Sequence, residues 1–170
     1  DRLGQLDVPG LVPITTEEDF VNHTTWQQEV HTDMMLKSEF KTGKPVNTMV
    51  VIQDLAGLSW RHYNKTGLDR VAKAAKIGDC YYPERLKVAL VVNAPTIFAM
   101  IWKVVKYFYH PNTREKIQIH SGPATKEILK YVCPSVLPKY LGGERVDENG
   151  DPECSAFIGK GGRVPAHLTK

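Results

Sequence analysis

The sequence predicts an α/β fold built on a largely parallel sheet, and two observations lead to that prediction. Segments with helix and strand patterns alternate between residues 17 and 132, which is the order of an α/β protein. The segment Leu86–Asn93 is apolar on both faces of the extended chain, as in a strand that helices cover on both sides. A chain of 170 residues has the length of one domain, so we expect residues 1–170 to form a single unit.

The first half of the chain predicts two helices around one strand. Residues 1–14 contain two glycines and two prolines and predict an extended loop. Thr15 and Thr16, followed by three acidic residues, predict the start of a helix from Glu17 to Lys41. The apolar residues of that helix recur at roughly helical spacing: Phe20, Val21, Trp26, Val30, Met34 and Met35. Thr48–Leu55 then predicts a strand, and Thr66–Gly78 predicts a second helix.

The second half predicts two strands, two further helices and an irregular end. After the strand Leu86–Asn93, the segment Pro95–Tyr109 predicts a helix that is apolar almost all round and is interrupted by two lysines. Such a helix is either buried or faces lipid. Lys116–His120 predicts a third strand, and Ala124–Val132 a short helix. From Pro134 onward the chain is rich in proline and glycine, so we expect irregular structure that wraps the core.

The charge distribution indicates a membrane surface rather than nucleic acid as a partner. A net charge of +3 is too small to indicate nucleic-acid binding. Residues 100–140 nevertheless hold seven basic and two acidic residues: Lys103, Lys106, Arg114, Lys116, Lys126, Lys130, Lys139, Glu115 and Glu127. A basic stretch beside an apolar one favours an anionic membrane surface. A solvated lysine face explains the same pattern equally well.

The sequence offers no evident metal, redox or catalytic motif. Its three cysteines form no C-x-x-C pair, and its six histidines are scattered. It contains neither a G-x-S-x-G nor a G-x-G-x-x-G motif, and the glycines around Lys160 lack the spacing of a phosphate-binding loop. We therefore expect no enzyme, no metal and no cofactor. With no signal peptide or membrane-spanning stretch, we expect a cytoplasmic protein that visits membranes peripherally.

Three segments resemble a known family. They are Val51–Ser59 (VIQDLAGLS), Tyr81–Pro95 (YYPERL running to VVNAP) and Leu137–Gly143 (LPKYLGG). In this order and spacing they resemble the CRAL-TRIO lipid-binding domain, and most closely its phosphatidylinositol/phosphatidylcholine transfer proteins of the fungal secretory type. The resemblance spans about residues 48–143, without the N-terminal helical lobe of the family. Residues 1–170 are thus identified as the lipid-binding core of such a domain.

The resemblance implies a sheet floor, helices behind it and a mobile gate helix over an apolar lipid pocket. The helix predicted at residues 95–109 falls at the position of the gate, and its apolar positions are Ile97, Phe98, Ile101, Trp102 and Val105. An ordinary buried helix is the alternative interpretation. Gly143 corresponds to a hinge-region glycine that is linked to gate movement, although a simple turn explains it too. Asp54 is expected to accept hydrogen bonds from backbone N–H groups at the end of its strand.

The resemblance also implies binding residues. Glu84 and Lys116 correspond to a glutamate and a lysine that line the inositol phosphate site, and a plain salt bridge or two surface charges are the alternatives. The phosphatidylcholine site of the family uses small hydroxyl residues on the pocket floor. The matching positions here hold Met49, Val51 and Gly78, none of which has a hydroxyl group. Exchange of phosphatidylcholine for phosphatidylinositol is therefore in doubt.

These features predict a monomeric lipid carrier. We expect it to bind one phospholipid, phosphatidylinositol, and to transfer or present it between membranes in lipid transport and membrane trafficking. Two other functions stay open. The chain is alternatively a carrier of a non-phospholipid such as a tocopherol, a retinoid or a sterol-like molecule, which the apolar floor allows. It is alternatively a regulatory module that recruits a larger signalling protein to membranes.

Overall fold

The computed structural model describes residues 1–168 and confirms an α/β fold with a parallel sheet. The sheet has three strands, β1 (Met49–Asp54), β2 (Leu86–Val92) and β3 (Ile117–Ile119), in the order β1-β2-β3. Both neighbouring pairs are parallel, and each strand lies within one residue of its predicted bounds. The central strand is β2, which is the segment whose sequence is apolar on both faces.

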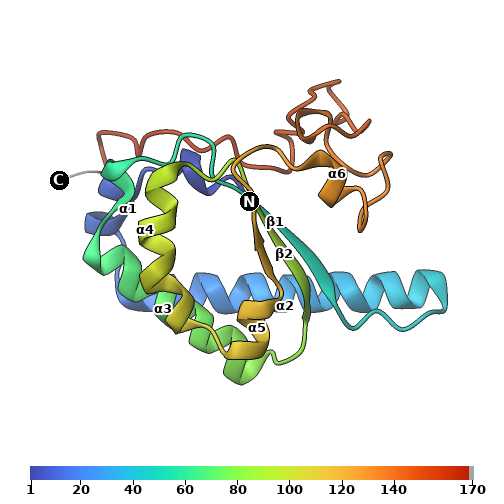
Figure 1. The fold of residues 1–170 in the computed structure, drawn as a ribbon, viewed down its shortest axis with the longest axis horizontal. Coiled ribbons are helices and arrows are strands. Elements are labelled where there is room, and N and C mark those ends of the chain that lie inside the picture. Colours follow the sequence, from blue (N-terminus) through green and yellow to red (C-terminus); the bar gives the residue numbers. More distant parts are fainter. Residues whose placement is uncertain (169–170) are drawn as a thin grey trace.

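The two faces of β2 belong to two separate apolar clusters. Val88, Leu90 and Val92 point to one face and pack against the chain that follows β3, in a cluster completed by Ile128, Leu137 and Leu141. Val91 points to the other face, where Leu55, Ala94 and Phe98 join it. Figure 1 shows the same division, with α3 and α4 on one side of the sheet and α6 on the other. This double covering explains why β2 needs apolar residues at successive positions.

The long helix α2 (Glu17–Thr42) matches its prediction closely. Thr16 caps it, because its hydroxyl accepts the Asp19 N–H while the Asp19 carboxylate accepts the Thr16 N–H. Trp26 and Met34 were part of the apolar pattern, yet their side chains are 60% and 62% exposed. Figure 1 shows that the C-terminal half of α2, which includes Met34, extends well beyond the sheet; Trp26 lies in the N-terminal half, so this overhang does not account for its exposure. Helical spacing alone therefore overestimated how much of this helix is buried.

The helices on the α4 side of the sheet also match, with shifted ends. The helix α3 (Lys65–Tyr81) continues three residues past its predicted end and is capped by Asn64, whose side-chain oxygen accepts the Gly67 N–H at 3.1 Å. The helix α4 (Thr96–Val105) is shorter than predicted, since the chain tightens into a 3₁₀ turn at Lys106–Phe108.

The prediction of an extended loop at residues 1–14 was wrong. A 3₁₀ turn at Leu3–Gln5 and a short helix, α1 (Val8–Ile14), occupy this segment. The carboxylate of Asp7 accepts the Gly10 N–H at 3.2 Å, and Pro9 stands in the first turn, where the N–H that proline lacks needs no partner. The same proline that indicates a loop is thus compatible with a helix start.

Two other short elements also differ from expectation. The helix α5 (Pro111–Glu115) was not predicted; it begins after His110, whose ring Nδ1 accepts the Asn112 N–H at 3.3 Å. The helix α6 (Thr125–Ile128) is shorter than the predicted Ala124–Val132. Elsewhere, 3₁₀ turns lie at Trp60–His62 and Lys139–Leu141.

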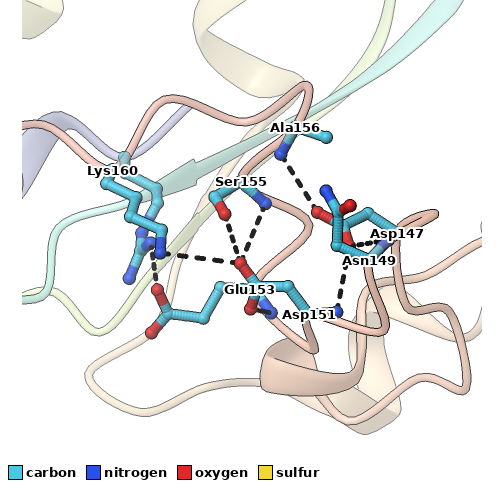
Figure 2. Close-up of polar contacts among 8 residues, drawn as sticks. Asp147, Asn149, Asp151, Glu153, Ser155, Ala156 and Lys160 are labelled. Atoms are coloured by element: carbon cyan, nitrogen blue, oxygen red, sulfur yellow. Dashed lines mark hydrogen bonds and ion pairs between the residues drawn. The ribbon is translucent and has the colours of Figure 1, made fainter.

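The C-terminal segment is irregular, as predicted, and polar side chains shape it. Figure 2 shows the centre of this network, where the buried Asp147 accepts N–H groups of Asn149, Asp151 and Ala156. Asp151 in turn accepts the Glu153 N–H at 2.9 Å. The N–H bonds lower the pKa of Asp147, and the hydroxyl of Ser155, followed by the Glu153 N–H, lowers the pKa of Asp151, because each donor stabilises the charged carboxylate.

The same segment returns to the start of the chain. Glu153 pairs with Arg2 at 3.1 Å, and the Gly162 N–H donates to the carbonyl of Gln5 at 3.1 Å. Figure 1 shows the resulting path, in which the last residues run back across the molecule toward α1. The network in Figure 2 therefore fastens the two ends of the described chain to each other.

Candidate functional site

The two residues predicted to bind a headgroup lie side by side. The Nζ of Lys116 donates to Oε2 of Glu84 at 2.9 Å. Glu84 comes shortly before β2 and Lys116 immediately before β3. Because β2 and β3 are parallel neighbours, their amino ends meet at the same edge of the sheet. The side chains are 75% and 30% exposed respectively, so a ligand can reach both.

The residues on either side of Glu84 attach this segment to α2, whereas the side chain of Glu84 stays exposed to solvent. The Tyr82 hydroxyl donates to Oε1 of Glu29 at 2.5 Å, and this hydrogen bond raises the pKa of Tyr82. The guanidinium of Arg85 donates to the Thr32 hydroxyl and lies 4.7 Å from the ring centre of Tyr82. Glu84 itself has a φ of 58°, in the left-handed region, and its side chain pairs with Lys116 instead.

The predicted floor residues occupy two different elements. Met49 and Val51 lie on β1 and both are half-buried, with an irregularity of the β1–β2 register directly after Met49. Val51 pairs with Ala89 of β2, so it lies on the face that carries Val91 and looks toward α4. Gly78 lies on α3 and not on the sheet. A Cβ at Gly78 would meet no heavy atom within 4 Å, so the glycine leaves open space beside the helix.

One floor residue was missed. Gln53 follows Val51 in the same alternation and pairs with Val91, so it lies on the same face of the sheet. It is half-buried, and no hydrogen bond or ion pair joins its amide to any part of the chain that the structure describes. The period of two along β1 was the signal that identifies it.

The helix predicted as a gate turns its aromatic side toward the sheet. Phe98 packs on the cluster around Val91, and its ring stacks on Trp102 with centroids 6.1 Å apart. Trp102 approaches Tyr109 at 6.4 Å, and Val105 is buried. The remaining predicted gate residues, Ile97 and Ile101, are half-buried.

The opposite side of α4 is exposed although it is apolar. Met100 and Val104 are 49% and 48% exposed, with the exposed Lys103 between them. Just beyond the helix, the exposed ring of Tyr107 lies between the Nζ of Lys106 at 5.0 Å and the guanidinium of Arg114 at 5.4 Å. A surface that combines apolar, aromatic and cationic groups suits the interface of an anionic bilayer.

Gly143 lies elsewhere, in the turn after the 3₁₀ segment Lys139–Leu141. A Cβ at this position would come within 2.0 Å of the Leu137 carbonyl oxygen, so steric closeness explains the glycine. Leu137 and Leu141 pack on the face of the sheet opposite α4. The proposed link to gate movement stays a prediction.

The two best-formed hollows in the described chain do not coincide with the predicted lipid pocket. One of about 600 Å³ lies beside Leu36 and Phe40, and one of about 550 Å³ is lined by residues 119–127. Both open widely to solvent, and neither is lined by the floor or gate residues. A lipid pocket between β1, β2 and α4 therefore stays a prediction.

Residues 1–168 contain no group of three or more histidine, cysteine, aspartate or glutamate side chains placed to hold a metal ion. Nor is any helix within them both long and apolar enough to cross a bilayer. At the end of β1, the predicted role of Asp54 is confirmed: its Oδ1 accepts the Ala56 N–H and the Asn93 side-chain amide, each at 2.9 Å.

Comparison with known proteins gives consistent matches. A family model described as the CRAL/TRIO domain matches residues 2–143, a range that includes all three segments behind the resemblance and so confirms it. The chain is 31% identical over 173 residues to Protein real-time of Aedes aegypti, covering 99% of this chain and 25% of that protein. It is 31% identical over 144 residues to the phosphatidylinositol/phosphatidylcholine transfer protein SFH9 of Arabidopsis thaliana, covering 84% of this chain and 25% of that protein.

A solved structure supports the same fold. The crystal structure of Sfh5 aligns with a TM-score of 0.67 at 23% sequence identity, covering 89% of this chain and 49% of that chain. The chain thus spans about a quarter of the length of the curated relatives that it matches.

Proposed function

This chain belongs to the CRAL/TRIO family of lipid-binding and lipid-transfer domains, and we propose that it binds one phosphatidylinositol molecule and transfers or presents it between membranes. Lys116 and Glu84 form a salt bridge, which was the alternative interpretation of these two residues; the choice of lipid rests on their joint exposure at the edge of the sheet, where the atoms of a headgroup can reach both. SFH9, whose name includes transfer of the same lipid, supports it.

The pair offers the two kinds of contact that this headgroup needs. The ammonium group of Lys116 suits the single negative charge of a phosphodiester. The carboxylate of Glu84 accepts hydrogen bonds from inositol hydroxyl groups. Since both side chains are partly exposed, ligand atoms insert between them or beside them without opening the core. Neither contact requires a covalent step, so the proposal does not involve catalysis.

The acyl chains would supply most of the affinity. They would lie between the floor face of the sheet and the aromatic side of α4, where Val51, Phe98 and Trp102 are half-buried rather than fully covered. Burial of each CH₂ group contributes about 0.8 kcal/mol. The exposed outer side of α4, with Met100 and Val104 beside Lys103, would meet the bilayer during uptake and release.

Mass spectrometry of lipids bound to the full-length protein, purified from a eukaryotic host without added lipid, tests the proposal. We expect phosphatidylinositol in a one-to-one ratio with the protein. Recovery of a different apolar molecule, together with no uptake from phosphatidylinositol vesicles, would contradict it and would leave Glu84 and Lys116 as structural charges.

The floor favours one competing function. Met49, Val51 and Gly78 provide no hydroxyl group where the phosphatidylcholine site of the family has them, which suits a carrier of a tocopherol, a retinoid or a sterol-like molecule. The charged pair at Glu84 and Lys116 argues against this alternative, because those ligands carry no phosphate. The same mass spectrum separates the two functions.

A further inference from the structure

Asp79 connects two segments that are distant in sequence. It lies in the last turns of α3 and is half-buried. Its Oδ2 accepts the backbone N–H of His110 at 2.8 Å, and its Oδ1 accepts the hydroxyl of Thr113 at 2.8 Å. Both donors belong to the connection between α4 and β3. One carboxylate therefore fastens this connection to α3.

The same connection carries Lys116. The carbonyl oxygen of Thr113 accepts the Lys116 N–H at 3.1 Å, which sets the turn from which the lysine side chain leaves. On the other side, Asp79 precedes Glu84 by five residues, at the end of the helix that leads into it. The contacts of Asp79 thus join the segment that holds the lysine to the segment that holds the glutamate.

Asp79 also contacts the chain that follows the C-terminal end of α4, at His110. Tyr109, which follows the 3₁₀ turn after that helix, contacts the Trp102 ring on the side of α4 that faces the sheet. Burial, and then the negative charge of Asp79, raise the pKa of Tyr109, in agreement with a short distance between the two side chains. The residue after Tyr109 donates its N–H to Asp79.

We propose that Asp79 is a positioning residue: its two hydrogen bonds hold Lys116 within bonding distance of Glu84 and fix the C-terminal end of α4. Headgroup selection and the position of the gate helix would then depend on one carboxylate. The inference rests on the proposed function, because it acts through Lys116. A purely structural cap of α5 would stabilise the fold without affecting which lipid is bound.

A double-mutant cycle in the full-length protein tests the proposal. The variants are Asp79→Ala, Thr113→Val, Lys116→Ala and the pairwise combinations with Lys116→Ala. We expect Asp79→Ala to weaken binding of vesicle phosphatidylinositol about tenfold, and Thr113→Val somewhat less, since it removes one of the two bonds. In the Lys116→Ala background, either change should add less than about a twofold loss, because coupled residues are not additive.

The controls distinguish positioning from stability. Asp69→Ala removes an exposed aspartate from the same helix and should leave lipid binding unchanged. Asp79→Asn keeps one acceptor oxygen and should fall between wild type and Asp79→Ala. Uptake of an uncharged fluorescent acyl probe and the thermal midpoint should change little in Thr113→Val.

Three outcomes have different meanings. Equal losses for phosphatidylinositol and for the acyl probe would overturn the positioning role, as would full additivity with Lys116→Ala. If Lys116→Ala alone keeps wild-type phosphatidylinositol binding, then the headgroup site of the proposed function is wrong and the role of Asp79 with it. A loss that is confined to phosphatidylinositol and absent in the Lys116→Ala background supports the proposal.

Discussion

Replacing Lys116 by alanine separates a binding role from a structural one. The expected loss of binding free energy is larger than the expected loss of folding stability. The Lys116–Glu84 pair spans 2.9 Å, but its side chains are 30% and 75% exposed, and an exposed ion pair contributes roughly 0–1 kcal/mol to stability. The hydrogen bond from the Lys116 backbone N–H to the Thr113 carbonyl oxygen does not depend on the lysine side chain and is kept in the variant. A charge-assisted hydrogen bond to a ligand phosphate contributes about 1.5–3 kcal/mol, which corresponds to roughly 10- to 150-fold in affinity. We therefore expect a large loss of binding with a small loss of stability.

Two measurements on each variant check this expectation. Transfer of labelled phosphatidylinositol between vesicles reports binding, and thermal unfolding reports stability. Lys87→Ala is the matched control, since it removes an exposed lysine near the amino end of β2 and causes the same change in net charge. If Lys116→Ala and Lys87→Ala transfer phosphatidylinositol equally well, the ligand does not use this lysine. If Lys116→Ala instead unfolds at much lower temperature, the pair is structural.

Three further predictions concern the glycines and the C-terminal network. Gly143→Ala should lower the free energy of unfolding by about 1–3 kcal/mol, because its Cβ would lie 2.0 Å from the Leu137 carbonyl oxygen; denaturant titration measures this. Gly78→Ser should be as stable as wild type or more stable by about 0.5 kcal/mol, because the new Cβ meets no atom within 4 Å and serine has a higher helix propensity than glycine. Lipid uptake assays on this variant then show whether a hydroxyl group at position 78 allows phosphatidylcholine to bind. The pKa of Asp151 falls from 3.8 to about 2, so its contribution to stability is complete above pH 3.8 and is lost as the pH falls toward 2; thermal unfolding across this range should show a weaker pH dependence in Asp151→Asn than in wild type.

The sequence predicts the sheet well because β2 carries a signal that does not depend on its surroundings. Its successive apolar residues require cover on both faces, and Leu90 and Val92 are fully buried in the structure. The errors lie in short elements. Whether Pro9 ends a loop or begins α1 depends on the Asp7 side chain, and α5 is held by an aspartate on a distant helix. The second of these contacts spans 31 residues, and local pattern cannot predict contacts of that range.

The candidate site was predictable only in part, for the same reason. Glu84 and Lys116 are 32 residues apart, and their contact follows from the parallel pairing of β2 and β3. Charge and spacing alone did not distinguish them from the other surface charges of this chain, and the family resemblance was needed to select them. Neither its charge nor the family resemblance pointed to Asp79. Its proposed role depends on two hydrogen-bond donors, the His110 N–H and the Thr113 hydroxyl, which it contacts only in the folded chain.

Exposed apolar surface is not sufficient to identify a gate helix in this molecule. Phe40 near the end of α2 is 94% exposed, far more than Met100 or Val104 on α4, yet nothing connects that part of α2 to the candidate ligand site. What distinguishes α4 is the combination of its two sides. Phe98 on its inner side packs against the sheet, and its outer side is apolar. The chain that follows α4 is hydrogen-bonded to Asp79 and continues to Lys116. A movement of α4 would therefore change the pocket and the headgroup site together, whereas a movement of the free end of α2 would change neither.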